Sequence, residues 1–465
     1  MGMKFKKYAT GACVLGFIII VLVYFPDIKI TLFENGRCSV ILRKFMTNPK
    51  LCTLESGKAA QYPRASPSPV SVDECAKWRR NPTGANLSLT SQVWVRSDTA
   101  ADIFVYSAYY DVDDDNVPVI RVIGIGSRMG TYHVISLVQW SADSTCLEDR
   151  PATVEIMPDH HWKRYSAMFV MCKLNVSESR KPFAVSIAQA NTTQLKHKLL
   201  VKYPEPFRFN ITVCLPCIHS KYNDETETIQ SIEMDQTLGV EHFVVYNYSI
   251  GDEVKNVVNY YFSQGILEIN VWNLPEVEVH YFGQLAAVND CVYSNRGKSK
   301  YVIVKDLDEV LVPYKDKTLP TLINRMMANE PLAGAIMFRS TFFHKEWPDD
   351  MEGFEDAQRA KQFHLYTLLK TWRETKIWDS QSRSKMISLP NRVHIQGIHY
   401  VLKMRKGFVE TEVDTKEGLV HHYREWSATT DKMKETFLRV FSDLLIDKCN
   451  RTFHFIHRNS VIKNG

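Results

Sequence analysis

The sequence predicts an α/β protein whose C-terminal half is built on a mostly parallel sheet and is preceded by a smaller β-rich domain. Predicted strands alternate with predicted helices from residue 209 to residue 304, which is typical of a parallel sheet covered by crossing helices. An apolar strand, 301–304, then runs directly into the acidic sequence Asp306-Leu307-Asp308-Glu309. Residues 93–140 instead contain short β-branched and aromatic runs that predict strands without helices between them.

The first 75 residues predict a membrane anchor followed by a stem. An almost uncharged apolar stretch covers residues 8–25 and follows three lysines within residues 1–7. About 18 apolar residues are near the lower limit for a transmembrane helix, and the preceding basic residues keep the N-terminus in the cytoplasm. No small-residue cleavage site follows, so we expect a type II signal anchor, and its short span favours the early secretory pathway. Residues 26–75, with three prolines among serines, are expected to form the stem.

Six N-x-S/T sequons agree with a lumenal location, at Asn86, Asn175, Asn191, Asn210, Asn247 and Asn450. Nine of the ten cysteines lie outside the predicted span, and this odd number predicts at least one free thiol or intermolecular link. Cys146 and Cys172 bracket a strand-rich segment and are a candidate disulfide pair. Cys214-x-x-Cys217 lacks the thioredoxin-like context of a redox motif, so we interpret it as structural, buried or disulfide-bonded.

Residues 76–204 are predicted to form the β-rich domain, with strand-like runs at 93–95, 103–106, 119–125 and 133–140. The acidic run 111–116 lacks the glycine and closing glutamate of a calcium loop, so we expect a hairpin turn there. The net charge of +5 without a long basic run gives no indication of a nucleic-acid partner.

Residues 205–425 are predicted to form the α/β domain. Strands are expected at 209–215, 242–246, 267–271 and 301–304, with helices at 226–238 and 254–262 between them. In the second helix Val254, Val257, Val258, Tyr261 and Phe262 share one face, and Gly265 ends it. Apolar residues from 433 to 445 predict an amphipathic helix within a C-terminal segment, 426–465.

The acidic strand end is the strongest indication of chemistry. Asp306 and Asp308 are two residues apart, so both side chains can face one hard cation. Like charges this close are tolerated only in water or on a metal, and a solvated acidic turn is the alternative interpretation.

The sequence 306–311 also fits the motif of haloacid-dehalogenase-type phosphatases, in which Asp306 would be a phosphorylated nucleophile. That motif normally lies on the first strand of its domain, whereas three predicted strands precede it here. The later lysine and paired aspartates of those enzymes have no convincing counterpart, so this class stays an alternative.

An ordered set of motifs extends the comparison beyond the acidic pair. They are Phe243-Val244-Val245-Tyr246-Asn247-Tyr248-Ser249, Phe282-Gly283-Gln284, Asn289-Asp290-Cys291, Asp306-Leu307-Asp308-Glu309, Arg383-Ser384-Lys385-Met386-Ile387, Pro390, Gly397-Ile398-His399 and His421-His422-Tyr423-Arg424. Together they resemble glycosyltransferase family 92, formerly domain of unknown function 23, over about residues 205–425. The likeness is closest to its animal β-1,4-galactosyltransferases.

The resemblance implies a GT-A-type, nucleotide-sugar-binding domain in a single-pass type II protein of the Golgi membrane. Such an enzyme would transfer galactose from UDP-galactose to a glycoprotein or oligosaccharide, with Mn²⁺ and with inversion. The acceptor would be a terminal galactose or fucose of an N-glycan, in β-1,4 linkage. Whether a homodimer forms through the stem stays open.

By analogy with GT-A enzymes, Asp308 would ligate the metal directly, and Asp306 would reach it through water or contact the ribose. His422 or His399 would complete the metal site. Lys385 and Arg424 would balance the charge of the diphosphate.

Strand ends before the acidic motif are expected to hold the nucleotide. Leu215-Pro216 would lie near uracil, with Tyr246-Asn247 at the end of the next strand, and Asp290 would contact ribose or donor sugar. Asn247 is therefore expected to be unmodified, because a glycan there would block the nucleotide.

The base that inversion requires is expected among Glu346, Asp349 and Asp350, with Glu309 as an alternative. Trp347, next to these carboxylates, is the candidate acceptor platform. A different class of function, a lumenal glycan-binding protein without turnover, is favoured by the unassigned β-rich domain. For each of these ionisable residues, a structural or surface role is the competing interpretation.

Overall fold

The computed structural model describes residues 28–32, 38–42, 89–97, 99, 102–144, 146–190, 195–425 and 431–463. The chain divides into two compact units, residues 1–70 and 71–465. In the first unit β1 (Ile28–Leu32) and β2 (Cys38–Leu42) form an antiparallel hairpin within the segment predicted as the stem. The predicted anchor, 8–25, lies outside the described residues. No helix within the described part of the chain is long and apolar enough to cross a membrane.

The β-rich domain consists of one extended sheet with the strand order β7-β6-β10-β11-β4-β5-β9-β8, with β3 paired to β4. The strands are β3 (Val95–Arg96), β4 (Ile103–Val112), β5 (Pro118–Ser127), β6 (Val134–Gln139), β7 (Glu148–Pro151), β8 (Thr153–Ile156), β9 (Tyr165–Lys173), β10 (Ala184–Gln189) and β11 (Leu199–Lys202). The predicted acidic hairpin turn is confirmed, since β4 and β5 pair in register around it. Asp113 closes the turn by accepting hydrogen bonds from the backbone N–H groups of Asp115 and Val117.

The α/β domain is built on a mixed sheet with the order β14-β13-β12-β15-β20-β17-β23. Its strands are β12 (Phe209–Ile218), β13 (His242–Asn247), β14 (Leu267–Val271), β15 (Ser299–Val304), β17 (Ala333–Phe338), β20 (Lys385–Ser388) and β23 (Val409–Glu412). The four predicted strands are confirmed and run parallel to one another. β20 is antiparallel to both β15 and β17, so the sheet is parallel only in part.

The remaining elements surround this sheet. A second sheet, β16-β24-β18-β19-β25, consists of β16 (Glu309–Val312), β18 (Ser340–His344), β19 (Trp372–Glu374), β24 (Leu419–Arg424) and β25 (Lys432–Lys434). A small hairpin pairs β21 (Val393–Gln396) with β22 (Val401–Met404). The helices are α3 (Glu225–Thr237), α4 (Asp252–Ser263), η1 (His280–Gly283), α5 (Gln284–Ser294), α6 (Leu319–Asn329), α7 (Ala357–Gln362), α8 (Tyr366–Leu369), η2 (Pro390–Arg392), η3 (Phe437–Phe441) and α9 (Ser442–Lys463).

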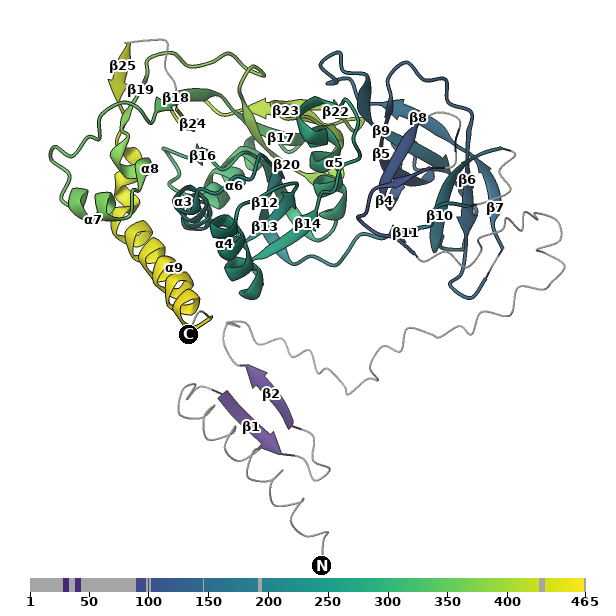
Figure 1. Ribbon diagram of the computed structural model, residues 1–465, viewed down its shortest axis with the longest axis horizontal. Helices are drawn as coiled ribbons and strands as arrows, with labels where there is room; N and C mark the ends of the chain where they lie inside the picture. The colour runs from purple at the N-terminus through teal and green to yellow at the C-terminus, as the bar shows by residue number, and fades with distance from the viewer. Residues whose placement is uncertain are drawn as a thin grey trace, which may run out of the picture. The chain divides into compact units, whose positions relative to one another are not determined.

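Strand alternation decides what covers each face of the mixed sheet. Along β12, Ile211, Val213 and Leu215 pack into a core with α3, α4 and α9. The intervening Cys214 packs on the other face, in a core that α5 shares with apolar residues of the β-rich domain. Figure 1 shows the β-rich domain, in blue, beside the α/β domain, in teal and green. The two predicted domains therefore share a core and form one compact unit.

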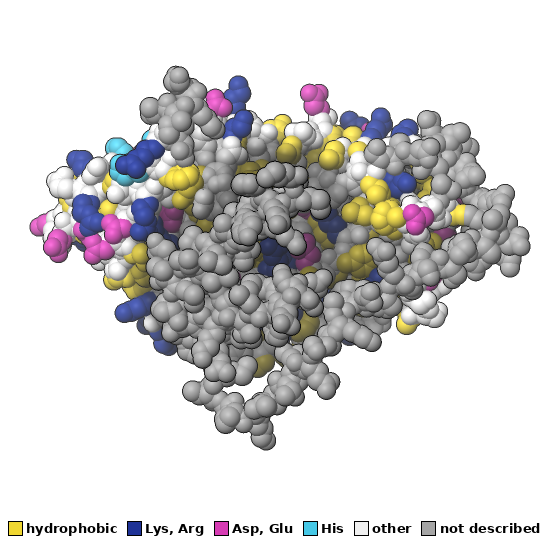
Figure 2. All heavy atoms as spheres, turned by 90° about the horizontal axis from the view of Figure 1, so that it is seen from below, with side chains coloured by type: hydrophobic (Ala, Val, Ile, Leu, Met, Phe, Trp, Pro, Cys, Tyr) yellow, Lys and Arg dark blue, Asp and Glu magenta, His cyan; other side chains and the backbone are white. Residues whose placement is uncertain are grey.

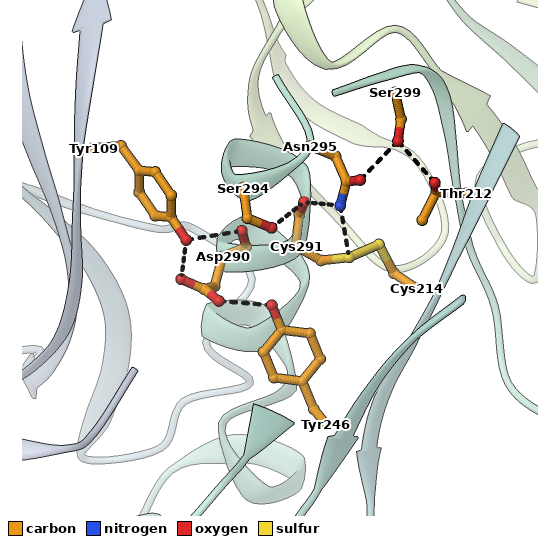
Figure 3. Close-up of a disulfide and its surroundings, with 9 residues drawn as sticks. All are labelled: Tyr109, Thr212, Cys214, Tyr246, Asp290, Cys291, Ser294, Asn295 and Ser299. Atoms are coloured by element: carbon orange, nitrogen blue, oxygen red, sulfur yellow. Dashed lines mark hydrogen bonds between the residues drawn. A yellow bond between two sulfur atoms is a disulfide. The ribbon is translucent and has the colours of Figure 1, made fainter. Parts of the chain in front are cut away.

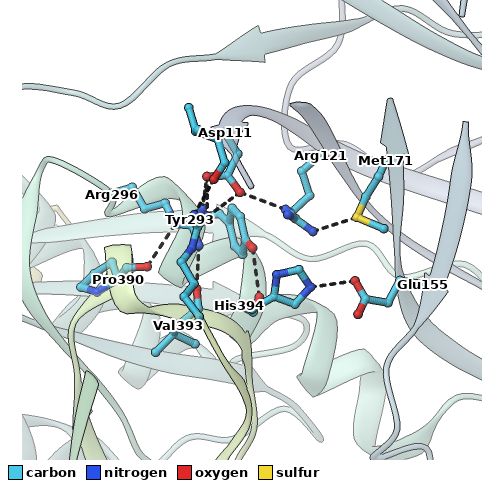
Figure 4. Close-up of polar contacts among 11 residues, drawn as sticks. Asp111, Arg121, Glu155, Met171, Tyr293, Arg296, Pro390, Val393 and His394 are labelled. Carbon is cyan, nitrogen blue, oxygen red and sulfur yellow. Dashed lines mark hydrogen bonds and ion pairs between the residues drawn. The ribbon is translucent and has the colours of Figure 1, made fainter. Parts of the chain in front are cut away.

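A polar cluster also joins the two predicted domains (Figure 4). Asp111 of β4 pairs with Arg121 of β5, with Arg296 after α5, and with Arg405 after β22. Burial lowers the pKa of Arg296, yet a guanidinium keeps its charge in proteins. All of these side chains except Arg405 are buried, so the contact belongs to the interior of the unit.

A disulfide between Cys214 and Cys291 ties α5 to β12 (Figure 3). This confirms the structural interpretation of Cys214, since its partner is not Cys217. The candidate pair of Cys146 and Cys172 is wrong. Cys172 is a buried free thiol, and Cys146 is disulfide-bonded to a different residue.

Two helix predictions need correction. In α4, Val254, Val257, Val258 and Tyr261 are buried as predicted, but Phe262 is 57% exposed because it lies beyond the edge of the buried face. The closing helix begins later than predicted, at Ser442, because β25 pairs with β19 and the 3-10 helix η3 directly precedes α9.

On the uncovered part of the face in Figure 2, acidic and basic side chains are interspersed at the left end. Exposed ion pairs of this kind join α7 to α9, where Arg359 contacts Asp443 and Asp447. Such pairs are solvated and contribute little to stability.

Candidate active site

A cleft of about 930 Å³ opens where β12 and β15 end, near the upper end of the range of about 300–1,000 Å³ for small-molecule sites. β12 and β15 are parallel neighbours, and the Lys305 N–H donates to the Cys214 carbonyl, 3.3 Å away. The residues that follow both strands therefore meet at one edge of the sheet. Leu215 and Pro216 line the cleft there, as the sequence predicted for a nucleotide site.

Both aspartates of the acidic motif face the cleft. The Asp306 side chain is 42% exposed and that of Asp308 is 33% exposed, whereas Glu309 is 1% exposed. Glu309 begins β16 and accepts a hydrogen bond of 2.9 Å from the Asp306 N–H. The motif therefore places two carboxylates at the surface of the cleft and one beneath it.

Lys385 lies beneath the motif and does not line the cleft. Its Nζ is 3.0 Å from Glu309 Oε2 and 3.2 Å from Asp306 Oδ2. Burial alone would lower the pKa of Lys385, but these two carboxylates raise it above its ordinary value. The predicted contact of Lys385 with a diphosphate is therefore wrong, because its ammonium is already used to neutralise the acidic motif.

The tandem histidines on β24 have opposite environments, because neighbouring strand residues point to opposite sides. His421 faces the core, where its Nε2 is 2.6 Å from the Tyr314 hydroxyl, and burial lowers its pKa to about 3. His422 faces the cleft, because β24 pairs with β16 in a register that sets it opposite Glu309. This alternation decides which histidine can act as a ligand.

His422 contacts two members of the acidic motif. Its Nε2 is 3.3 Å from Asp308 Oδ2, and its Nδ1 is 3.3 Å from Glu309 Oε1. Burial alone would lower the pKa of His422, but the carboxylates of Glu309 and Asp308 raise it. The pair of Asp308 and His422 presents an oxygen and an imidazole nitrogen to the same part of the cleft.

Within the described residues, no group of three or more His, Cys, Asp and Glu side chains is arranged to hold a metal ion. Cations that act with phosphates are commonly held by one or two protein ligands, with phosphate oxygens and water completing the shell. Asp308 and His422 fit that requirement, and imidazole and carboxylate are both suitable ligands for such metals. His399 also lines the cleft, where its Nδ1 lies 3.3 Å from the Ser384 carbonyl.

The cleft also contains charged side chains to which the sequence assigned no role. Arg383, Lys345 and Glu227 line it, together with the predicted Arg424. Glu227, in the first turn of α3, accepts hydrogen bonds from Lys345 and Tyr366. Burial raises the pKa of Glu227 above its ordinary value, although Lys345 opposes that effect. Arg383 lies in one of the ordered sequence motifs, whereas Lys345 and Glu227 gave no signal, because they come from elements far from the acidic motif.

The loop predicted to hold the base and the acceptor platform, residues 346–350, is not part of the cleft wall, whereas the alternative base Glu309 is. Asp350 is wrong as a base, because its carboxylate is buried and pairs with Lys434. Asp349 pairs with Lys370 at 2.8 Å. Glu346 and Trp347 follow β18 on the same loop.

Tyr246, Asn247 and Asp290 do not line the cleft either. Figure 3 shows Asp290 between Tyr109 and Tyr246, whose hydroxyls donate hydrogen bonds of 2.7 and 2.6 Å to its carboxylate. Ser107 donates to the same carboxylate, and Asp290 and Tyr246 are both fully buried. The predicted contact of Tyr246 and Asp290 with nucleotide is wrong, because packing of the β-rich domain on α5 encloses them. Asn247, at the end of β13, is half-buried.

Part of the cleft wall comes from the β-rich domain. Asp159 and His161, from the loop between β8 and β9, line the cleft beside His280 and Tyr281 of η1. The role of this loop could not be predicted, because nothing local in its sequence shows which surface it contacts.

Comparison with known proteins points to one family. A family model described as glycosyltransferase family 92 matches residues 209–454. The β-1,4-galactosyltransferase galt-1 of Caenorhabditis elegans is 21% identical over 342 residues, which cover 69% of this chain and 74% of that protein. The glycosyltransferase family 92 protein F13G3.3 of the same organism is 20% identical over 340 residues, covering 69% of this chain and 63% of that protein.

Among solved structures, glucosyl-3-phosphoglycerate synthase from Mycobacterium tuberculosis, in complex with Mn²⁺, uridine diphosphate and glucosyl-3-phosphoglycerate, aligns with a TM-score of 0.24 and 14% identity. The alignment covers 53% of this chain and 80% of that one. A TM-score this low supports no inference about the present chain.

Proposed function

Because this chain belongs to glycosyltransferase family 92, we propose that it transfers galactose from UDP-galactose to a glycan with inversion at the anomeric carbon. The observation that carries the proposal is the pairing of Asp308 with His422, 3.3 Å apart, in a cleft at the carboxyl end of β15. The similarity to a C. elegans β-1,4-galactosyltransferase supports galactose as the sugar and a β-1,4 linkage. We propose a terminal galactose or fucose of an N-glycan as the acceptor.

The fold proposed for this activity is of the GT-A type. In the mixed sheet, β12, β13 and β14 precede β15 in the chain, so the acidic motif follows the fourth strand of the domain. That order agrees with a nucleotide-sugar domain and disfavours the phosphatase alternative, in which the acidic motif normally lies on the first strand.

Basic side chains of the cleft are assigned to the donor diphosphate. Arg383, Arg424 and Lys345 all line the cleft around the acidic motif. A guanidinium can bind two phosphate oxygens at once, whereas an ammonium acts as a point charge. Leu215 and Pro216, at the end of β12, would then contact the nucleobase, and Asp306 would contact the ribose.

Asp308 and His422 would hold a divalent cation, with Mn²⁺ as the proposed metal. When bound, the cation would neutralise the negative charge that develops on the leaving diphosphate. The protein's contribution is orientation, because the contact between Glu309 and Nδ1 of His422 turns Nε2 toward Asp308. Lys385 in turn fixes Glu309 from below.

Inversion requires a group that accepts the proton of the attacking hydroxyl. Glu227 replaces the predicted carboxylates as our candidate, because it lines the cleft and is buried. Its raised pKa favours uptake of a proton. Tyr222 and Tyr366 hold its position by donating hydrogen bonds to Oε2 and Oε1 at 2.9 and 3.2 Å.

The proposal is tested by measuring release of UDP from UDP-galactose with Mn²⁺ and a galactose- or fucose-bearing N-glycan. Asp308→Ala is expected to abolish release while leaving the thermal midpoint unchanged, because this side chain is partly exposed and supports no core. Asp443→Ala is the matched control, since Asp443 is 83% exposed on α9. Absence of turnover with every UDP-sugar would contradict the proposal.

Chelation provides an independent test of the metal. EDTA is expected to remove activity and excess Mn²⁺ to restore it, without unfolding. Full activity after exhaustive chelation would refute the assignment of Asp308 and His422. Glycan binding that survives both chelation and Asp308→Ala, without any turnover, would favour the alternative of a binding protein.

We further propose that the protein resides in the Golgi membrane as a type II protein, with the domains of residues 76–425 in the lumen. The proposal is supported by the apolar stretch 8–25 after basic residues and by the sequons. Protease protection of the C-terminus in sealed vesicles, with microscopy against Golgi markers, tests it. Digestion of the C-terminus in intact vesicles would contradict the topology.

A further inference from the structure

One loop of the β-rich domain forms part of the cleft wall. It joins β8 to β9 through residues 157–164, and its Asp159 and His161 line the cleft. Hydrogen bonds within the loop define its shape, because the Lys163 N–H donates to the His160 carbonyl and the Trp162 N–H donates to Nδ1 of His160. The loop is therefore an ordered turn that reaches the active site.

The backbone of this loop is unusual at two consecutive positions. His161 and Trp162 have φ angles of 49° and 60°, in the left-handed region that non-glycine residues rarely adopt. Two neighbouring residues in this region cost free energy, which the surrounding contacts have to offset, and such backbone clusters at functional sites. His161 lines the cleft, whereas Trp162 does not line it and is exposed to solvent.

A second segment with two consecutive positive φ angles contacts this loop. Tyr281 and Phe282 of η1 also have positive φ angles, 41° and 56°. The imidazole rings of His161 and His280 stack with centroids 3.6 Å apart, and the Tyr165 N–H donates to the Glu278 carbonyl at 3.0 Å. The two loops, one from each predicted domain, thus form a single rim of the cleft.

This rim exposes aromatic surface next to polar groups. The Trp162 side chain is 82% exposed and that of Tyr281 is 49% exposed. The Arg128 guanidinium lies 5.4 Å from the Trp162 ring and the His160 ring packs edge-on against it at 5.6 Å, so neighbours support the indole. A tryptophan this exposed is unusual, because its ring is usually largely buried.

We propose that this rim, with Trp162, His161, Asp159 and Tyr281, is the acceptor-glycan subsite. A sugar has apolar C–H faces that stack on an aromatic ring and hydroxyls that bond to imidazole and carboxylate groups. An indole flanked by polar and charged side chains matches that pattern. This inference rests on the proposed transfer reaction. In that reaction the β-rich domain would present the acceptor to the donor cleft.

The test compares kinetic constants of the full chain and its Trp162→Ala variant. The acceptor is a labelled biantennary N-glycan with core fucose and terminal galactose. The KM for this glycan is expected to rise about tenfold in Trp162→Ala, equivalent to about 1.4 kcal/mol. The KM of Trp162→Phe is expected to lie between those of the wild type and Trp162→Ala. The KM for UDP-galactose is expected to stay within about twofold, because the variant changes only the rim. An unchanged KM for the glycan, or an equal rise in both constants, would overturn the inference.

The matched control is Phe262→Ala, which removes an aromatic ring that is 57% exposed on α4 and does not line the cleft. It is expected to change neither KM. Thermal midpoints of both variants are expected to match the wild type, because exposed side chains contribute little to stability. A rise in the glycan KM of the control equal to that of Trp162→Ala would overturn the assignment to the rim.

Direct binding separates this inference from the transfer reaction. Fluorescence anisotropy with the same glycan, without donor, measures affinity even if no UDP-sugar is turned over. Loss of binding in Trp162→Ala supports the subsite even when the proposed transfer fails. Equal affinity of variant and wild type, or no binding by the wild type at micromolar to millimolar glycan, refutes the subsite whether or not UDP is released.

Discussion

Replacing Asp111 with asparagine is expected to weaken the junction between the β-rich domain and the α/β domain (Figure 4). Its carboxylate receives Arg296 Nη1 at 2.5 Å and Arg121 Nε at 3.2 Å. Arg405 Nη2 contributes two further contacts, at 2.5 and 2.6 Å. Asparagine keeps the size of the side chain but removes its charge, so three guanidinium groups lose their common counterion.

The size of the effect follows from the pKa of Asp111. Although burial alone would raise it, the three arginines lower the pKa from 3.8 to about 2. At 1.36 kcal/mol per pH unit the difference corresponds to about 2.4 kcal/mol of folding free energy at neutral pH. Removal of one partner from a buried ion pair costs about 3–5 kcal/mol in measured cases. We therefore expect Asp111→Asn to destabilise the unit by about 2–5 kcal/mol at pH 7.

The pH dependence has a defined sign. Because the folded-state pKa is depressed, the contribution of Asp111 is complete above pH 3.8 and is lost as the pH falls toward 2. The difference in unfolding free energy between wild type and Asp111→Asn is thus expected to be constant from pH 7 to about 5. It should fall to about half near pH 3.

Urea denaturation followed by tryptophan fluorescence measures this difference, since Trp94 and Trp272 pack together between the two domains. Asp443→Asn is the control, because its pair with Arg359 is solvent-exposed, and its urea midpoint should match the wild type. An Asp111→Asn midpoint equal to that of the wild type at pH 7, or a difference that grows on acidification, would refute the reasoning.

Two further substitutions and one mapping experiment test other parts of the structure. Cys214 and Cys291 are 77 residues apart in sequence, so their disulfide restricts a long loop of the unfolded chain. Removing it should lower the free energy of unfolding by up to about 4.5 kcal/mol through loop entropy. Urea denaturation with and without reductant measures this change. Lys385→Met removes the ammonium next to Glu309, a carboxylate that is 1% exposed, and leaves it with the contact to His422. A loss of about 3–5 kcal/mol is expected, and an unchanged thermal midpoint would contradict the pairing. Peptide mapping should find Asn247 without a glycan, because the residue is half-buried in β13; substantial occupancy there would contradict the structure.

Several parts of the site could be predicted from local sequence. The apolar run of β15 and the acidic residues after it identify a strand end, and Asp306 and Asp308 do face the cleft. Leu215 and Pro216 lie there for the same reason, since neighbouring parallel strands end at the same edge. His422 was singled out by its motif, but only the register between β16 and β24 distinguishes it from His421.

Other parts could not be predicted because they depend on packing between distant segments. Asp290 looked like a nucleotide contact, yet the β-rich domain covers it and supplies hydrogen bonds from Tyr109 and Ser107. Glu227 looked like an ordinary residue in the first turn of a helix, yet α3 places it in the cleft. Nothing in either local sequence carries this information.

By itself the sequence determined the alternation of strands and helices and the acidic strand end, because periodicity and composition act over a few neighbouring residues. Tertiary structure alone decided which charged groups are buried and which face the cleft. Burial depends on which distant elements cover a side chain, as α5 and the β-rich domain cover Asp290 but leave Asp308 open. The loop with His161 is the same case, since only the fold brings it from the β-rich domain to the edge of the active site.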